Sequence, residues 1–400
     1  MTEQTQDNSY SKIRKYIFML MAGHTATDIN QGALPAALPF LVRQHSLSFS
    51  AAGGLMLALT GISSIIQPLL GYLSDRVGNP QIMSVGIILA GLGFSALGLA
   101  TSYPIMFICV LICGVGIALF HPEGGRMVNC IAQTNKGTAM GTFVVGGSIG
   151  FTAGAIMIAI IVPTFGLRSL LFFMIPGLIV VALLQYNRKA LKNFSQIEYD
   201  KRTDTSLERK KDNWKGFIVL AIIILLDSIA NYGLITFIPL FWVNVVGQTE
   251  AVASVILGIM MGIGAVSTYL GGKLADRFGF RNMIVIGSFL YGPSILFAGL
   301  STNLIPASIA ILCIGFTINL IRSPAVALGQ RYLPNHVGMA TGITLGLAVS
   351  FGGIASPILG RIGDLYGLVT VILVLAAIGG LVAFLSLLIK NDKAKSTSSN

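Results

Sequence analysis

The chain has 400 residues, of which 54% are hydrophobic and only 10% are charged, and its formal net charge is +11. A soluble protein of this length would carry about 25% charged residues, so the composition excludes an ordinary soluble enzyme and predicts an integral membrane protein. The positive charge by itself would suit a nucleic-acid binder, but its distribution along the chain excludes nucleic acid as a partner.

Twelve apolar segments are long enough, at about 20 residues each, to cross about 30 Å of hydrocarbon as helices. They cover residues 16–41, 50–73, 81–100, 104–126, 137–162, 168–186, 216–243, 251–273, 282–300, 304–331, 337–360 and 367–389. We therefore predict an all-α integral membrane protein with two pseudo-symmetric six-helix lobes. The lobes are residues 16–186 and 216–389, the linker is 187–215, and residues 1–15 and 390–400 are terminal tails.

Basic residues are distributed unequally over this topology. Arg43, Arg168 and Arg361 are the only ones on the outer side, Arg322 lies within a segment, and the other 22 of 26 lie on the side of the termini. The linker holds nine Lys or Arg against five acids. Because basic residues favour cytoplasmic loops, we expect both termini and the linker in the cytoplasm and the chain in the bilayer of the cell (inner) membrane. No cleavable signal peptide is evident.

One motif occurs twice, 201 residues apart. Residues 71–78 (GYLSDRVG) return as 272–279 (GKLADRFG), and 137–141 (GTAMG) as 338–342 (GMATG). Asp28 has its counterpart in Asp227, and Pro39 in Pro239. A shorter sequence similar to the duplicated motif, GRIGD at 360–364, ends a segment on the opposite side of the membrane. An inverted three-helix repeat within each lobe predicts such a copy. A duplicated, two-lobed membrane protein of this kind indicates transport.

These motifs resemble the major facilitator superfamily, whose loops after the second and eighth helices carry a Gly-x-x-x-Asp-Arg-x-Gly signature. A narrower resemblance, to the fosmidomycin-resistance type of efflux protein, rests on residues 24–35 and 119–126. The resemblance to the major facilitator superfamily covers nearly the whole chain and implies a secondary transporter, which we expect to be a monomer. The glycine-rich residues 146–154 lack the proline of the typical antiporter motif.

The duplicated motif supplies the candidate gate residues, which are Gly71, Asp75, Arg76, Gly272, Asp276 and Arg277. Each Asp sits at a cytoplasmic helix end and can face the positive N-terminus of a helix in the other lobe. Asp75 would reach the start of the helix near residue 338, and Asp276 the start near residue 137. Such contacts would close the cytoplasmic side. The alternative is a tight loop with a solvated charge, and the two glycines are favoured as packing residues.

Asp28 lies about 12 residues into the first segment, hence roughly 18 Å deep. A charge near the bilayer centre costs about 2.5 to 3.5 kcal/mol, so it needs a compensating environment. His24 and Gln31 share its helix face at spacings of four and three. We predict that Asp28, His24 and Asp227 couple protons to transport. The alternative is that the acids are structural and held by hydrogen bonds.

A second polar group is predicted to bind substrate. Its members are Arg322, His121, Glu123, Arg126, Gln31, Asn231 and Asn319. Glu123 and Arg126 are three residues apart and can form an internal ion pair instead. Arg322 has no acid within a turn on its own helix, and a guanidinium facing a cavity can hold a carboxylate or phosphonate at two points. An interhelical ion pair is the alternative for Arg322.

The sequence contains no nucleotide or cofactor motif. Gly271-Gly272-Lys273 is followed by Leu274, so it lacks the Ser or Thr of a phosphate-binding loop, and energy must come from an ion gradient. Cys109 and Cys113 share a helix face as packing residues, and we predict no disulfide, no metal site and no cofactor.

The predicted function is proton-coupled export of a small anionic or zwitterionic compound, as in drug efflux, by alternating access. Two other transport functions remain open: export of a self-made metabolite such as an amino-acid-derived metallophore, and import of a small organic anion by symport. A remote alternative is an intramembrane enzyme or a receptor.

Overall fold

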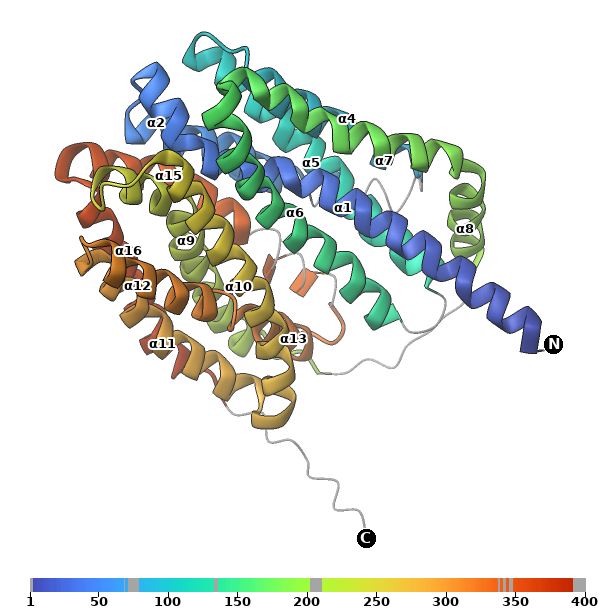
Figure 1. The fold of residues 1–400 in the computed structure, drawn as a ribbon. Coiled ribbons are helices and arrows are strands. Elements are labelled where there is room, and N and C mark those ends of the chain that lie inside the picture. Colours follow the sequence, from blue (N-terminus) through green and yellow to red (C-terminus); the bar gives the residue numbers. More distant parts are fainter. Residues whose placement is uncertain are drawn as a thin grey trace.

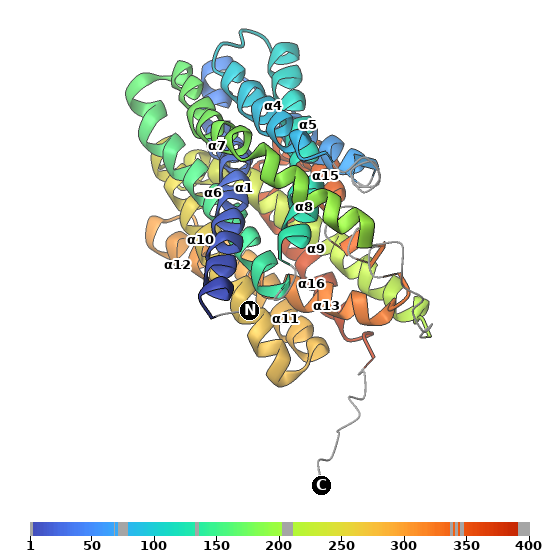
Figure 2. The ribbon, with the colours of Figure 1, turned by 90° about the vertical axis from the view of Figure 1, so that its right-hand side faces the viewer.

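The computed structural model describes residues 3–67, 69–70, 79–132, 136–201, 211–336, 339–340, 343–344 and 348–390. Within these ranges the chain is built from helices and contains no strand. The two termini lie at the same end of the bundle (Figures 1 and 2). We call the opposite end, which carries the loops around residues 46–48, 98–102, 245–249 and 301–303, the far end.

Two groups of helices follow one another along the chain (Figure 1). The N-terminal group consists of α1 (Glu3–His45), α2 (Phe49–Met56), η1 (Leu57–Ile62), α4 (Gln81–Leu97), α5 (Tyr103–Ile131), α6 (Lys136–Phe165), η2 (Leu167–Phe173), α7 (Met174–Tyr186) and α8 (Arg188–Lys201). The C-terminal group consists of α9 (Trp214–Asn244), α10 (Glu250–Phe278), α11 (Phe280–Leu300), α12 (Leu304–Thr317), α13 (Arg322–Tyr332), α15 (Ala348–Tyr366) and α16 (Leu368–Ser386).

Nine helical stretches of the described chain are long and apolar enough to span a membrane, and Gln81–Leu97 is apolar but shorter. The chain is therefore a multi-pass membrane protein. All twelve predicted segments overlap helices, but α1 and α15 do not meet the same length and hydropathy criteria within the described residues. The number twelve stays a prediction.

The structure departs from the predicted elements in three places. Helix α1 begins at Glu3, so most of the predicted tail 1–15 is helical, and α8 occupies residues 188–201 of the predicted linker. Helix α8 forms because its buried Leu191 and the ring of Phe194, which lies 5.5 Å from that of Tyr16, pack on the N-terminal group. Segment 304–331 is interrupted between Thr317 and Arg322, where turns replace the helix.

The hydrophobic core is continuous at the far end and divided at the end that carries the termini. One large cluster joins the far halves of helices from both groups, for example α1, α5, α9, α10 and α16. Toward the termini, one cluster contains only side chains of the N-terminal group and another only those of the C-terminal group. The two groups are thus packed together at one end of the molecule and have separate cores at the other.

Charged contacts close the far end. The carboxylate of Asp364, at the end of α15, accepts hydrogen bonds from the backbone N–H groups of Phe49 (2.7 Å) and Ser50 (3.0 Å) and from the Ser50 hydroxyl. It thereby caps the N-terminus of α2, where the helix dipole favours an acid. Arg43 and Glu250 form an ion pair between the two groups at 2.7 Å.

Candidate functional site

Three titratable side chains meet inside the N-terminal group. His24 Nε2 lies 3.2 Å from Asp28 Oδ2, and His121 Nε2 lies 3.0 Å from Asp28 Oδ1. Helix α1 carries His24 and Asp28 one turn apart, and α5 brings His121 from the other side. We call these three residues the triad. Only 8% of the Asp28 side chain and 11% of the His24 side chain are exposed, against 24% for His121.

The hydrogen bond of His24 to the backbone determines which ring nitrogen carries a hydrogen. Its Nδ1 is 2.8 Å from the carbonyl oxygen of Phe143, which can only accept, so Nδ1 carries a hydrogen. In a neutral ring Nε2 then presents a lone pair to Asp28 Oδ2. Nε2 lies 3.2 Å from Asp28 Oδ2, so a ring protonated at Nε2 as well forms an ion pair with the carboxylate. The geometry therefore describes a buried histidine–carboxylate pair within ion-pair distance.

Close packing of α6 makes this arrangement possible. A Cβ atom on Gly147 would lie 2.6 Å from His24 Nε2 and 2.8 Å from Asp28 Oδ2, well inside the roughly 3.5 to 4.0 Å of normal contact. Gly150 is similarly tight against Asp28. The glycines that the sequence places at 146–154 thus let the α6 backbone lie directly on the acid of α1.

Glu123 and Arg126 form a two-point ion pair on α5, with Arg126 Nη2 and Nε at 2.6 and 2.9 Å from the carboxylate oxygens of Glu123. Glu123 is fully buried, and Arg126 also donates to Ser195 of α8 at 2.9 Å. The arrangement therefore connects α5 to α8. It is the internal ion pair that the sequence analysis gave as the alternative to substrate binding for Glu123 and Arg126. This geometry favours a structural role over substrate contact.

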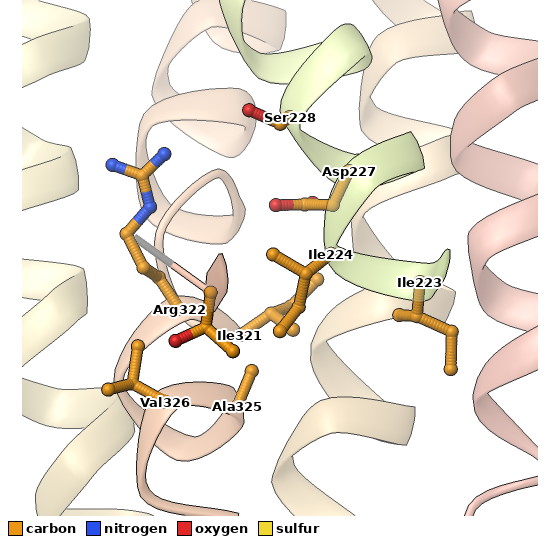
Figure 3. A pocket seen from close by; sticks show the side chains of 9 residues that line it. Ile223, Ile224, Asp227, Ser228, Ile321, Arg322, Ala325 and Val326 are labelled. Carbon is orange, nitrogen blue, oxygen red and sulfur yellow. The ribbon is translucent and has the colours of Figure 1, made fainter. Parts of the chain in front are cut away.

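The C-terminal group contains a pocket of about 40 Å³ between α9 and α13. Asp227 and Ser228 line it from α9, and Arg322, Ala325 and Val326 from α13 (Figure 3). Asp227 points toward Arg322 across the pocket (Figure 3), yet no ion pair within 4.0 Å joins Arg322 to a carboxylate of the described residues. Asp227 Oδ1 is buried without a hydrogen-bond partner. Because buried polar atoms are normally bonded, this pocket is equipped for a polar ligand or water.

The interruption of the tenth predicted segment places Arg322 at the first turn of α13. The positive end of the helix dipole and the guanidinium therefore lie together, and both favour an anion. Asn319, in the interrupted stretch, accepts a weak hydrogen bond from Asn231 of α9 at 3.4 Å. Interrupted helices of this type line binding sites in other transporters.

The internal repeat has produced an equivalent arrangement in both groups. His121 and Arg322 are 201 residues apart, and Asp28 and Asp227 are 199 apart. In each group an acid on the first helix faces a basic side chain on the fourth. Helices α1 and α9, which carry the two acids, contribute side chains to the same hydrophobic cluster, and Tyr232 of α9 is buried. Tyr232 and Ser228 were not among the residues predicted from the sequence, although both are within five residues of Asp227.

The other predicted residues are placed as follows. Gln31 is buried on α1. Gly71, Asp75 and Arg76 lie outside the described residues. Asp276 is exposed and forms no hydrogen bond or ion pair within the described part of the chain. Its predicted partner near residue 137 adjoins residues 133–135, which lie outside the described residues, so this contact stays a prediction. Gly272 is only half-buried, whereas its neighbour Gly271 is in tight contact with the Leu320 carbonyl.

Apolar helices packed in two groups around buried polar sites define a multi-pass membrane transporter. The chain belongs to the Major Facilitator Superfamily, whose sequence pattern matches residues 20–357. It is a transporter and not an enzyme.

Two relatives cover most of the chain. The uncharacterized MFS-type transporter YfnC of Bacillus subtilis is 27% identical over 390 residues, covering 96% of this chain and 95% of YfnC. The fosmidomycin resistance protein of Escherichia coli is 25% identical over 343 residues, covering 85% and 84%.

Solved structures share the fold. A bacterial homolog of the human lysosomal transporter Spinster, in an inward-facing and unoccupied conformation, superposes with a TM-score of 0.78 at 16% identity, covering 94% of this chain and 97% of that one. The nucleoside transporter NupG gives a TM-score of 0.70 at 14% identity, covering 93% of this chain and 98% of NupG.

We expect Gly147→Ala to inactivate transport while leaving the protein folded, because the added methyl group displaces His24 or Asp28 from their pairing. Flux of a transported compound in proteoliposomes, together with the melting temperature, measures the two effects. Gly141→Ala is the matched control, since a Cβ on Gly141 of the same helix meets no atom within 4 Å. Equal flux in the two variants would show that the triad tolerates displacement.

Proposed function

We propose that this protein is a proton-coupled secondary transporter that exports a small anionic or zwitterionic compound by alternating access. The observation that carries the proposal is the triad, in which a buried carboxylate lies within ion-pair distance of two imidazoles in the interior of a membrane protein. Such a group can gain a proton on one side of the membrane and lose it on the other. Intramembrane acids and histidines commonly form proton relays in transporters.

The substrate's charge is inferred from the pocket between α9 and α13. Arg322 and the start of α13 supply positive potential, and Arg322 has no carboxylate of the described residues within ion-pair distance. A carboxylate, phosphonate or phosphate group suits this site because it can accept two parallel hydrogen bonds from one guanidinium. The acid of the triad would accept a cationic group on the same molecule, so a zwitterion is compatible.

The direction of opening supports alternating access. The helix groups share one core at the far end and have separate cores at the other end. With the termini and the basic linker on the cytoplasmic side, this arrangement is inward-facing. The Asp364 cap and the Arg43–Glu250 pair then form the closed external gate. Asp364 belongs to the inverted copy of the duplicated motif, and it performs at the far end the capping that was predicted for Asp75 and Asp276 on the cytoplasmic side.

We expect Asp364→Ala to move the protein toward the outward-facing state. The substitution removes charge-assisted hydrogen bonds to the first turn of α2, each worth about 1.5 to 3 kcal/mol, so the outward-facing population should rise at least about tenfold. Distances between spin labels at the exposed positions Ser102 and Thr302, at the far end of the two groups, report the change. Asp276→Ala is the control, and a rise in that variant equal to the Asp364→Ala effect would contradict the assignment.

Counterflow in proteoliposomes tests the proposed function. Labelled fosmidomycin, chosen because it is named in a relative, is the first probe, followed by compounds that accumulate in a deletion strain. A carrier exchanges unmodified solute, and a coupled exporter also accumulates solute when a pH gradient is imposed. Exchange without any response to the pH gradient would refute proton coupling, and a response of opposite sign would identify a symporter.

A further inference from the structure

We propose that the triad is also a binding site for a divalent transition-metal ion such as Zn²⁺, with His24, Asp28 and His121 as its three protein ligands. The inference rests on the same residues as the proposed function but concerns a different ligand. It revises the expectation from sequence that the chain has no metal site.

The positions of the donor atoms carry this inference. One donor from each residue lies within 4.8 Å of the other two, and the nitrogen-to-oxygen separations within the triad are 3.0 and 3.2 Å. Ligands bound tetrahedrally to zinc at about 2.0 to 2.1 Å lie about 3.3 Å from one another. The two histidines contact different oxygens of the Asp28 carboxylate, so each of these pairs needs a displacement of only a few tenths of an ångström, whereas a pair at the 4.8 Å limit would have to close by about 1.5 Å around the ion.

The surroundings of His24 also favour a metal site at the triad. Metal-ligating histidines typically donate their second ring N–H to a carbonyl or carboxylate, which fixes the tautomer and directs the other nitrogen at the metal. His24 does this through Nδ1 and the carbonyl of Phe143, whose ring also stacks on the imidazole with centroids 4.3 Å apart. The imidazole is thus oriented with its Nε2 toward Asp28 before any ion arrives.

The donor set selects the class of metal. Two imidazoles and one carboxylate suit zinc and neighbouring transition metals, whereas calcium and magnesium prefer sets made of oxygen only. Three protein ligands leave a fourth position for water or for a donor atom of a transported compound. The partly exposed His121 gives an entry route. Because a ligating imidazole nitrogen must be unprotonated, any proton held on His24 Nε2 is released as the ion binds.

Titration of the purified, metal-stripped full-length protein with Zn²⁺ tests the site. Calorimetry should give one ion per chain, and Co²⁺ should give the intense visible absorption of a tetrahedral complex with nitrogen and oxygen ligands. We expect His121→Gln to weaken binding at least about tenfold, as losing a ligand costs no less than losing a second-shell partner. Melting temperature without metal identifies any variant that fails to fold.

The matched control is His336→Gln. His336 Nδ1 lies 2.9 Å from Asp212 Oδ2, a histidine–carboxylate pair as close as those of the triad, but outside the membrane and with no third ligand among the described residues. We expect it to bind Zn²⁺ like the wild type. Absence of stoichiometric binding, or equal loss in His336→Gln and His121→Gln, overturns the site.

Counterflow measured in the presence of EDTA separates this proposal from the transport function. If the wild type exchanges solute and responds to a pH gradient but binds no Zn²⁺, the metal site is wrong and proton-coupled transport stands. If it binds Zn²⁺ at the triad but shows no response to the pH gradient, the metal site stands and the coupling role is wrong.

Discussion

Asp28→Asn should abolish accumulation driven by a pH gradient while leaving counterflow of substrate intact. A gradient of one pH unit is worth about 1.4 kcal/mol per proton, which supports about a tenfold concentration ratio in the wild type. An asparagine cannot exchange a proton with His24, so the variant should only equilibrate its substrate, reaching a ratio of one. Parallel measurement of pH-driven accumulation and counterflow in the same proteoliposomes distinguishes lost coupling from lost transport.

Asp212→Asn is the control for this experiment. Asp212 also faces a histidine, His336, but lies in the segment before α9 outside the membrane. Burial alone would raise the pKa of Asp212, but hydrogen bonds from Asn335 and His336 outweigh it and hold the pKa below its usual value. We expect this variant to accumulate substrate normally. If Asp28→Asn also concentrates its substrate, Asp28 is a structural acid and the coupling proton lies elsewhere.

Arg322→Lys should weaken substrate binding by about ten- to a hundredfold, the equivalent of one charge-assisted hydrogen bond of about 1.5 to 3 kcal/mol. Lysine keeps the positive charge beside the start of α13 but cannot bond one anionic group at two points. The dissociation constant of the purified protein, measured with the compound identified by counterflow, gives the effect.

Arg361→Lys is the matched control, because Arg361 is exposed on α15 and distant from the pocket. The melting temperature of each variant separates affinity from folding. Affinity unchanged in Arg322→Lys, or a loss of affinity accompanied by an equal loss in thermal stability, would assign Arg322 to an internal contact with Asp227 rather than to substrate.

The spacing of residues along the sequence was sufficient to predict the contacts that form within one helix. The i,i+4 relation of His24 and Asp28 and the i,i+3 relation of Glu123 and Arg126 put each pair on one helix face, and both pairs are in contact in the structure. The family could also be predicted, since the duplicated motif and the apolar segments are properties of the sequence alone. Helix α8 was missed because its polar composition resembled a linker, and it is stabilised by contacts with α1 and α5.

The sequence alone determined that this is a helical membrane protein with an internal repeat, because hydrophobic length, charge asymmetry and repetition do not depend on how helices pack. The resemblance of its duplicated motif to the major facilitator signature indicated the family. Only the tertiary structure decided which distant residues act together. His121 meets Asp28 across 93 positions, and Asp364 caps α2 across 315. The break before Arg322 and the closure of the far end were likewise decided by packing. These contacts depend on which helices become neighbours and on which end of the bundle is closed, and no periodicity within a single segment specifies either.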